Sequence, residues 1–469
     1  MSSSFLKIGA LVAFVVLLVA LKVVVTYSSD KVTITENVLC SEFLGFGTEF
    51  NPFIHTYTNE AFVQEADMET LESLVEELRP QLVRIFIYLN WWRNGEKDML
   101  SSLERTLQLA KQVGADVHLT VSGGWSAPLY VESSWGTTAL ETAIALHSLV
   151  TEKGFTNIKY INIGNEPNTT QQGPEAHVGL HLALDKALRN FGLREQIKIM
   201  AGDITAAGRD AWLPYLGENL GNVLDSYSVH IYWNYWDSTK DYIPKLSGIR
   251  DIISPSARKP VLVMEFGNRG KRGPDSSGDP GIDLEEVHMS DSPIAAFELS
   301  MFMLQALKHG MSGMSKWEAW DGYYKDMKRF IHHGLVGISD GQWKPKPSYE
   351  LYMLFTRSTR RGWEVRDVAT KNSNITSVAM NGDDECTIFL RNESGKMGKV
   401  TVEGLPENST MHSYSFTLIP SSAPGIKSTW RGGLKEGKEV GATDARGRIT
   451  IEIPGQTLLV LTTLNIAEE

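Results

Sequence analysis

The sequence has few cysteines and no excess of positive charge. Its 469 residues include only two cysteines, Cys40 and Cys386, which excludes a scaffold built on several disulfide bonds and a cysteine-rich metal site. The 45 lysines and arginines are outnumbered by 56 aspartates and glutamates, so the formal net charge is -11. Such a chain offers no basic face for a phosphate backbone, and nucleic acid is not an expected partner.

Motifs for bound cofactors and metals are also missing. The sequence contains no phosphate-binding P-loop, no H-E-x-x-H pattern and no closely spaced cysteine pair, and no G-x-G-x-x-G follows the first expected strand. His332 and His333 are adjacent, so their side chains diverge and do not form a ligand pair. We therefore expect no cofactor and no metal.

Long apolar runs are absent except at the N-terminus. After Lys7 the chain is apolar from Ile8 to Leu21, and beyond Lys22 it stays apolar to Val25. This run approaches the roughly 20 residues that a membrane helix needs, and no small-x-small cleavage site follows it. Residues 1–27 are expected to be either a signal peptide or a membrane anchor. Both alternatives predict a protein that is secreted or membrane-anchored, with the rest of the chain outside the cytosol.

Short apolar, β-rich runs alternate with longer amphipathic segments between residues 41 and 360. This alternation predicts a parallel sheet with helical crossovers, and eight such units predict a (β/α)8 TIM barrel; a doubly wound open sheet is the alternative. Capping-box patterns indicate helix starts at Ser101 and Thr138. Gly154, Gly192 and Gly310 are expected to end helices. The expected strands are 43–50, 81–89, 116–122, 158–164, 197–202, 226–232, 260–266 and 313–319.

The pattern changes after residue 360. Residues 361–469 consist of short alternating strands separated by Gly, Asn, Ser and Pro, which predicts an antiparallel β-sandwich domain. Residues 31–40 alternate in the same way and are expected to add a strand to that sandwich. Cys40 and Cys386 would then lie in one domain, where they form either a disulfide or two buried free thiols.

Two carboxylates stand where apolar strands end. Glu166 follows the fourth expected strand in "GNEPN", and Glu265 closes the seventh in "VLVMEFGN". In a TIM barrel, functional side chains gather at the carboxyl ends of the strands, so the two glutamates are expected to converge. Such a pair suits the cleavage of a glycosidic bond, in which one carboxyl group protonates the leaving oxygen and the other attacks the anomeric carbon.

These two motifs resemble those of the clan A glycoside hydrolases, in which an Asn-Glu-Pro motif follows the fourth strand and a second Glu ends the seventh. The resemblance covers nearly the whole chain, because members with this layout carry a β-sandwich built from both termini. It implies that Glu166 is the acid/base and Glu265 the nucleophile of a retaining β-glycosidase. The implied substrate is an oligosaccharide, polysaccharide or glycoconjugate, cleaved by double displacement.

The resemblance also assigns supporting roles to polar residues near the strand ends. Asn165 matches the residue that hydrogen-bonds the sugar 2-hydroxyl. Arg84 matches an arginine near the nucleophile, where a cation keeps Glu265 ionised, although a buried structural ion pair is the alternative. His230 and Tyr232 match a polar pair beside the nucleophile and share one face of their strand.

Aromatic and acidic side chains complete the expected substrate-binding set. Trp125, and either Trp317 or Trp320, are candidates for the platform on which a sugar ring stacks. Strand alternation does not decide between the two later tryptophans. Glu49 ends the first strand, where it binds hydroxyl groups or caps a loop.

Two alternatives to hydrolysis remain open from the sequence. One is a cell-surface transglycosylase, which would transfer the sugar to an acceptor. The other is a carbohydrate-binding protein without catalysis on the same scaffold. N-x-[ST] sequons for glycosylation begin at Asn168, Asn374, Asn392 and Asn408.

Overall fold

The structure is a computed structural model, and it describes residues 29–56, 58–122, 132–169, 173–234, 238–269, 292–324, 329–339, 341–419 and 428–468. For residues 234, 238–241, 269 and 329 it describes the backbone alone. The expected signal peptide or anchor at residues 1–27 lies outside these ranges. In the described part of the chain, no helix is both long and apolar enough to cross a membrane.

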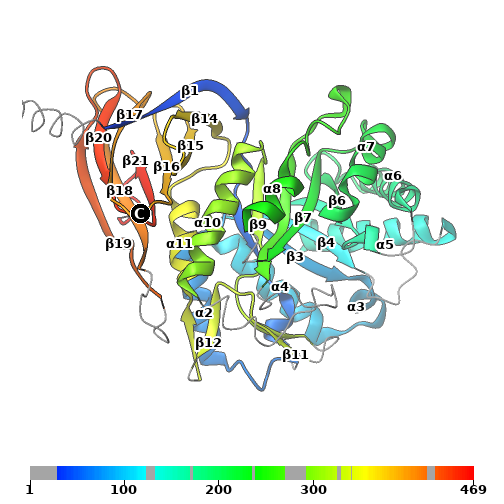
Figure 1. Cartoon of the computed structure of the whole chain (residues 1–469). Helices are drawn as coiled ribbons and strands as arrows, with labels where there is room; N and C mark the ends of the chain where they lie inside the picture. The colour runs from blue at the N-terminus through cyan, green and yellow to red at the C-terminus, as the bar shows by residue number, and fades with distance from the viewer. Residues whose placement is uncertain are drawn as a thin grey trace, which may run out of the picture.

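A closed barrel of eight parallel strands forms the larger part of the molecule (Figure 1). Each of the eight strands expected from the sequence is present, so the (β/α)8 prediction is confirmed. The strands are rich in residues that are buried on both faces, which is what a sheet covered by helices requires. They are β2 (Phe46–Glu49), β3 (Leu82–Tyr88), β4 (Asp116–Ser122), β5 (Ile158–Ile163), β6 (Lys198–Thr205), β7 (Ser226–Asn234), β8 (Val261–Arg269) and β9 (Gly313–Lys316).

Helices surround the barrel and bury their apolar faces against it. Gly192 and Gly310 follow α6 and α10 in the left-handed conformation, with φ of 67° and 75°, as expected of helix stops. The predicted starts at Ser101 and Thr138 are wrong, because α4 and α5 begin about one turn earlier. The helices are α2 (Glu65–Leu78), α3 (Leu89–Asn94), α4 (Lys97–Gln112), α5 (Trp135–His147), α6 (Pro174–Asn190), α7 (Arg209–Leu220), α8 (Ser238–Leu246), α10 (Pro293–Lys308) and α11 (Pro347–Arg357).

The barrel interior changes from apolar to polar along its axis. Near the amino ends of the strands lies a small apolar cluster of Leu82, Tyr160, Met200, Leu262 and Met264. Further along β3, Arg84 is fully buried and begins the polar part of the interior. Two short hairpins follow β9, formed by β10 (Gly322–Tyr324) with β11 (Arg329–Ile331) and by β12 (Val336–Ser339) with β13 (Gln342–Pro345).

Nine further strands form one sheet in the order β19-β18-β21-β16-β15-β14-β1-β17-β20. Apolar side chains from strands near both ends of this order, such as β18 and β20, share a single core. The sheet therefore folds back on itself as a sandwich. It is mixed, because β1 pairs with β14 antiparallel and with β17 parallel. The strands are β1 (Asp30–Cys40), β14 (Glu364–Thr370), β15 (Ile375–Asn381), β16 (Cys386–Asn392), β17 (Gly398–Glu403), β18 (Thr410–Ile419), β19 (Thr429–Ala442), β20 (Arg448–Ile453) and β21 (Thr457–Thr462).

The two cysteines do not form a disulfide, which was one of the two states that the sequence left open. Both thiols are free and buried. Cys40 pairs with Val365 of β14, and β14 and β15 separate β1 from β16, where Cys386 lies. Three strand spacings amount to roughly 14 Å, about twice the Cα separation that a disulfide allows. Burial raises the pKa of the Cys386 thiol to about 12, so this residue behaves as a core side chain.

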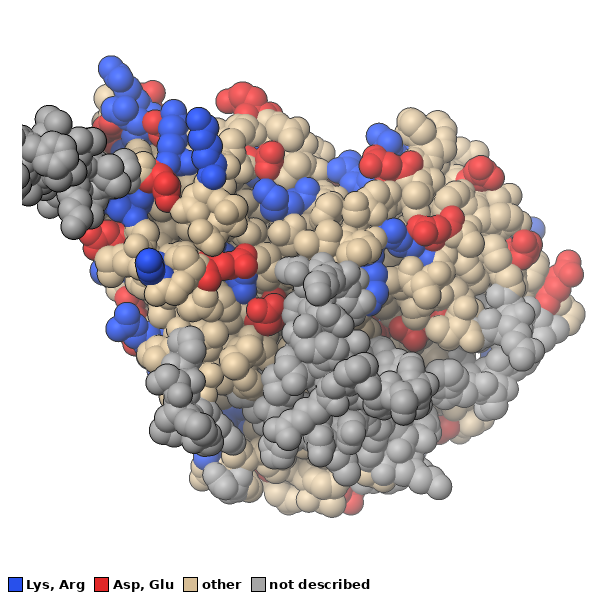
Figure 2. Space-filling view, in the orientation of Figure 1, with Lys and Arg blue, Asp and Glu red and all other residues tan. Residues whose placement is uncertain are grey.

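The sheet and the barrel pack against each other through α10 and α11, which lie between them in Figure 1. Phe355 of α11 stacks on Phe389 of β16, with ring centroids 4.5 Å apart. Arg357 reinforces the contact by donating to the carbonyl oxygen of Ile466 at 2.9 Å. On the described part of the face in Figure 2, small groups of basic and acidic side chains are interspersed among uncharged residues.

Candidate active site

The two glutamates singled out in the sequence lie together at the carboxyl ends of the barrel strands. Nδ1 of His230 is 3.1 Å from Oε1 of Glu166 and 3.4 Å from Oε2 of Glu265. One oxygen of each carboxylate and this ring nitrogen all lie within 4.8 Å of one another. The expected convergence of Glu166 and Glu265 is therefore present in the structure.

Irregularities in two strands aim these side chains. The pairing of β7 with β8 slips by one residue between Val229 and His230, so that His230 lies opposite Glu265 instead of Met264. Such a bulge re-aims a side chain without ending the strand. Glu166 follows β5 with a φ of 46°, an unusual conformation for a residue with a Cβ. Its backbone N–H donates to the carbonyl oxygen of Asp203 at 2.8 Å, which holds this turn.

Arg84 lies at the centre of the site and contacts four other residues through its terminal nitrogens. Nη1 is 2.9 Å from Oε2 of Glu265 and 3.2 Å from Oε2 of Glu49. Nη2 donates to Oδ1 of Asn165 at 2.7 Å and to Oδ2 of Asp203 at 2.8 Å. Burial opposes a charge here, but Asp203, Glu49 and Glu265 together raise the pKa of Arg84, so the guanidinium stays charged. The expected contact between Arg84 and Glu265 is present.

His230 is a buried imidazole among three carboxylates. Burial favours the neutral ring, but Glu265, Asp203 and Glu166 raise the pKa of His230 to about 9. Both ring nitrogens then carry protons at neutral pH. Among the described residues, Glu166, His230 and Glu265 lie close enough to one another to hold a metal ion. Without one, the contacts of His230 with the two carboxylates form a network of opposite charges.

Tyr232 contacts Glu265, and Trp317 follows the neighbouring strand β9, where its N–H donates to the carbonyl oxygen of Phe266 at 3.3 Å. The hydroxyl group of Tyr232 donates to Oε1 of Glu265 at 2.6 Å. Trp317 is half-buried, with its ring 6.2 Å from Phe86 and 5.9 Å from Tyr324. Trp320 is fully buried against Phe50, at 5.1 Å.

The choice between the two later tryptophans, which strand alternation left open, therefore favours Trp317, because a sugar can stack only on an accessible ring. Trp125, the other candidate platform, lies outside the described residues.

Two further carboxyl groups lie beneath the mouth. Glu49 is almost fully buried against Arg84, and burial, with Glu265 and Glu318, raises its pKa well above the usual range. Burial also raises the pKa of Glu318 to about 8, although Tyr324 donates a hydrogen bond to it at 2.8 Å. Glu318 is therefore mostly a neutral acid at neutral pH. The loop-capping role considered for Glu49 belongs instead to Asn51, whose Oδ1 accepts from the N–H of Phe53.

Sequence reasoning missed Asp203, Thr120 and Glu318. Thr120 of β4 bridges Arg84 and Asp203, with hydrogen bonds of 3.0 and 2.9 Å. The dipeptide Gly202-Asp203 inside an apolar strand was the available signal, because a glycine followed by a charge often marks a bulge. Glu318 directly follows Trp317, and nothing in its sequence surroundings distinguishes it from a surface charge.

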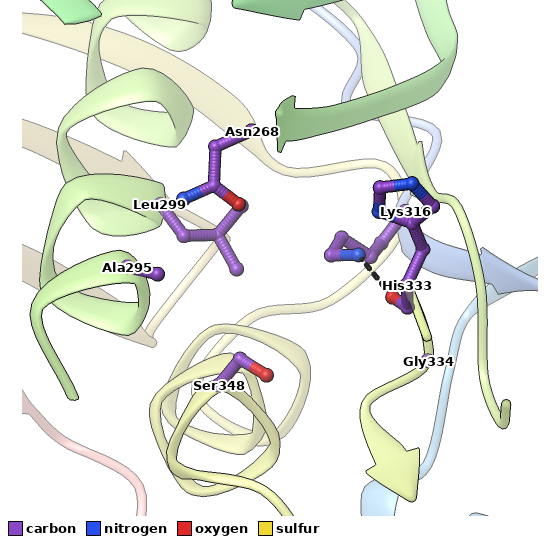
Figure 3. Close-up of a pocket in the computed structure, with 7 residues that line it drawn as sticks. All are labelled: Asn268, Ala295, Leu299, Lys316, His333, Gly334 and Ser348. Atoms are coloured by element: carbon purple, nitrogen blue, oxygen red, sulfur yellow. Dashed lines mark hydrogen bonds between the residues drawn. The ribbon is translucent and has the colours of Figure 1, made fainter. Parts of the chain in front are cut away.

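A small cavity of about 10 Å³ lies behind β8 and β9, between these strands and the helices α10 and α11 (Figure 3). Nζ of Lys316 donates to the carbonyl oxygens of Trp317 and of His333, the latter at 2.7 Å. The Lys316 ammonium group thus ties the Trp317 backbone to the segment before β12. The cavity is lined by Asn268, Ala295, Leu299, Lys316, His333, Gly334 and Ser348.

Replacing Lys316 with Met should remove a pH dependence of folding stability. Burial and the neighbouring Lys346 lower the pKa of Lys316 from 10.5 to about 7. Between these values the unfolded chain binds more protons, so the stability contributed by this group rises with pH across that window. Denaturant unfolding of the parent and of Lys316→Met at several pH values should show this rise only in the parent. The exposed Lys186→Met is the matched control, and an equal slope in all three proteins would contradict the prediction.

A larger cavity, of about 270 Å³, lies at the opposite end of the barrel. Its arginines donate to carbonyl oxygens near helix ends: Arg357 to that of Glu77 at 3.1 Å and Arg361 to that of Gly114 at 3.2 Å. Cations at these positions offset the partial negative charge of helix C-termini. We assign these contacts to structure and place the chemistry at the other end of the barrel.

Asn168 should remain without a glycan even in a host that glycosylates proteins. Its Nδ2 donates to Oγ1 of Thr205 at 2.7 Å, and its Oδ1 accepts from the N–H of Thr205 at 2.9 Å. A sugar on Nδ2 would disturb these bonds two residues from Glu166. Glycopeptide mapping of active protein should find Asn168 unmodified, with the exposed Asn374 as the comparison site. Full occupancy at Asn168 in active protein would refute this.

Comparison with known proteins gives a likeness at the level of structure. No protein-family model and no curated protein matches this chain. Among solved structures, a GH30 endoxylanase from Clostridium papyrosolvens C71 is 16% identical, with a TM-score of 0.64 over 92% of this chain and 99% of that chain.

Two further solved structures show the same coverage. The catalytic domain of the GH30 xylanase C from Talaromyces cellulolyticus is 14% identical, with a TM-score of 0.63 over 92% of this chain and 99% of that chain. An alpha-L-arabinofuranosidase from Thermotoga maritima is 10% identical, also with a TM-score of 0.63 over 92% and 99% of the two chains. The chain therefore shares its overall fold with these two xylanases and this arabinofuranosidase.

Proposed function

We propose that this protein is a retaining glycoside hydrolase that cleaves β-glycosidic bonds by double displacement. The observation that carries the proposal is the placement of Glu166 and Glu265, whose facing oxygens lie within 4.8 Å of each other across His230. Carboxyl groups of retaining enzymes are about 5–5.5 Å apart, whereas inverting enzymes need about 6.5–9.5 Å to admit a water molecule. The short separation supports a covalent route.

The contacts support a different role for each glutamate. Glu265 is held by Arg84, Tyr232 and His230, which fix the orientation of a carboxylate acting as nucleophile. Glu166 is the more exposed of the two, so it is the group that reaches a leaving oxygen and, later, a water molecule. In the first step Glu166 protonates the leaving oxygen while Glu265 attacks the anomeric carbon.

In the second step the ionised Glu166 takes a proton from water, and the resulting hydroxide displaces Glu265 from the sugar. Two inversions at the anomeric carbon give net retention. Arg84 and His230 offset the negative charge that returns to Glu265 when the covalent bond breaks. In this mechanism Asn165 hydrogen-bonds the 2-hydroxyl group of the sugar, and Trp317 stacks on a sugar ring.

The substrate class is a β-linked glycan or glycoconjugate. The solved structures of similar fold are described as xylanases and an arabinofuranosidase, which supports a carbohydrate substrate without fixing the sugar. We also propose, from the apolar run at residues 1–27, that the catalytic domain acts outside the cytosol. No cofactor enters the mechanism.

The test is to incubate the full-length protein with a panel of aryl β-glycosides and with β-glucan, xylan and mannan. Proton NMR at early times identifies the anomer that is released first. Release of the β-anomer from a cleaved β-glycoside supports the proposal, and release of the α-anomer overturns the retaining assignment. Addition of a sugar acceptor distinguishes the transglycosylase alternative, because transfer products would then exceed free sugar.

A further inference from the structure

Asp203 connects the two halves of the candidate site. Its Oδ2 accepts from Nη2 of Arg84 at 2.8 Å, and its Oδ1 lies 3.6 Å from Nε2 of His230, which is an ion-pair distance. Arg84 and His230 both contact Glu265. The backbone carbonyl oxygen of Asp203 accepts a hydrogen bond from the N–H of Glu166 at 2.8 Å. One residue thus supports the backbone of one glutamate and two side chains around the other.

The sequence around Asp203 produces this position through a bulge. Ala201 pairs with Tyr227 and Ile204 with Val229, so two residues of β6 lie opposite Ser228 alone. Gly202 is required there, because its φ is 130° and a Cβ would lie 2.3 Å from the carbonyl oxygen of Ser228. Asp203 follows with a φ of 48°, and its N–H donates to Oγ of Ser228 at 2.6 Å. A polar side chain held in a left-handed conformation on a bulge indicates a constraint other than stability.

The charges around Asp203 are unevenly distributed. It is fully buried, and Arg84, His230, His118 and Thr120 face it from neighbouring strands. Burial alone would neutralise a carboxyl group, but Arg84 and His230 lower the pKa of Asp203 well below its usual range. On the far side of His230 lie Glu265 and Glu166. Burial lowers the pKa of His118 to about 4, and those of His177 and His181 on α6 are also lowered, so these histidines are neutral.

We infer that Asp203 is a positioning residue that keeps His230 protonated and Arg84 oriented, and thereby sets the charge and placement of both glutamates. This inference rests on the proposed function for its catalytic consequence. Its electrostatic part is independent of catalysis, because it concerns only the protonation of His230. Asp203 does not reach the mouth and does not touch the reacting atoms.

The test is the variant Asp203→Asn, which keeps the shape of the side chain and removes its charge. Titration of the imidazole of His230, followed by NMR of 15N-histidine-labelled protein and assigned with His230→Asn, should show its pKa lowered by at least about one unit. On a cleaved aryl β-glycoside, kcat should fall about 100-fold, as for a small displacement of reacting groups, with KM changed less than about threefold. The matched control is Asp185→Asn on α6, a carboxylate paired with Arg189 and Arg194 outside the site.

A second variant separates placement from charge. Ser228→Ala removes the hydroxyl group that anchors the backbone of Asp203 but keeps the carboxylate, so kcat should fall less than in Asp203→Asn while the titration of His230 stays as in the parent. A parent-like titration of His230 in Asp203→Asn overturns the inference, as does a parent-like kcat in that variant. If the parent cleaves no glycan, the proposed function fails, but the His230 titration still decides the role of Asp203.

Discussion

Replacing Glu265 with Gln should lower kcat on an aryl β-glycoside by on the order of 10⁴-fold or more. A loss of this size is expected when the nucleophile is removed from a set of catalytic residues that act together. The amide keeps the size of the side chain and an oxygen that accepts from the Tyr232 hydroxyl, but it does not attack an anomeric carbon. The measurement is the initial rate on a substrate with a good leaving group. Mass spectrometry with a 2-deoxy-2-fluoro-glycoside should show a covalent adduct on the parent and none on the variant.

Glu318→Gln is the matched control for this loss. Glu318 lies in the same region of the barrel, but burial raises its pKa to about 8, so it is a neutral acid at pH 7. An amide in its place preserves the charge of the site, and kcat should stay within about tenfold of the parent value, within the range of one lost hydrogen bond. Equal losses of kcat in Glu265→Gln and Glu318→Gln would mean that the effect comes from disturbed packing and that Glu265 is not the nucleophile.

Replacing Glu166 with Ala should slow the cleavage of substrates with poor leaving groups by about 10²–10⁴-fold, the usual contribution of a general acid. An activated leaving group departs without protonation, so the first step should survive on such a substrate while the second step, which needs a base, becomes slow. The Ala side chain leaves space beside His230, where azide can enter without deprotonation. Sodium azide should therefore raise the turnover of Glu166→Ala and give a β-glycosyl azide.

The azide product gives this prediction two independent readouts. A β-configured azide shows that azide attacked from the face on which Glu166 lies, opposite the covalent bond to Glu265. An α-configured azide would mean that no glycosyl-enzyme preceded the attack. If azide leaves the turnover of Glu166→Ala unchanged while poor and good leaving groups suffer equally, Glu166 has no part in proton transfer.

The fold could be predicted from the sequence because its signals are local. Each barrel strand is a short apolar run, and the glycines at 192 and 310 occupy left-handed positions that few other residues adopt. Glu166 and Glu265 could be predicted as well, because a charge that ends a buried strand at the functional end of a barrel stands out from its surroundings. Helix starts were less predictable, since the capping patterns at Ser101 and Thr138 also occur inside helices.

The remaining parts of the site depend on distant residues that local patterns do not bring together. Asp203 reaches Arg84 only because a bulge in β6 re-aims it, and the register of that bulge is set by pairing with β7. The free state of Cys40 and Cys386 depends on strand order within a nine-stranded sheet, which alternation along one strand does not specify. The choice of Trp317 over Trp320 required knowing which ring packs on Phe50.

The position of β1 constrains how this protein is made. It leaves the ribosome before any part of the barrel, yet its two neighbours in the sheet, β14 and β17, are synthesised more than 300 residues later. For example, Val32 of β1 pairs with Thr370 of β14. Until then its apolar residues Val32 and Ile34 have no sheet to join and must be shielded while the barrel folds. The sheet is therefore complete only when β1 pairs with β14 and β17. A fragment that ends after the barrel would leave β1 unpaired and exposed as a site for aggregation.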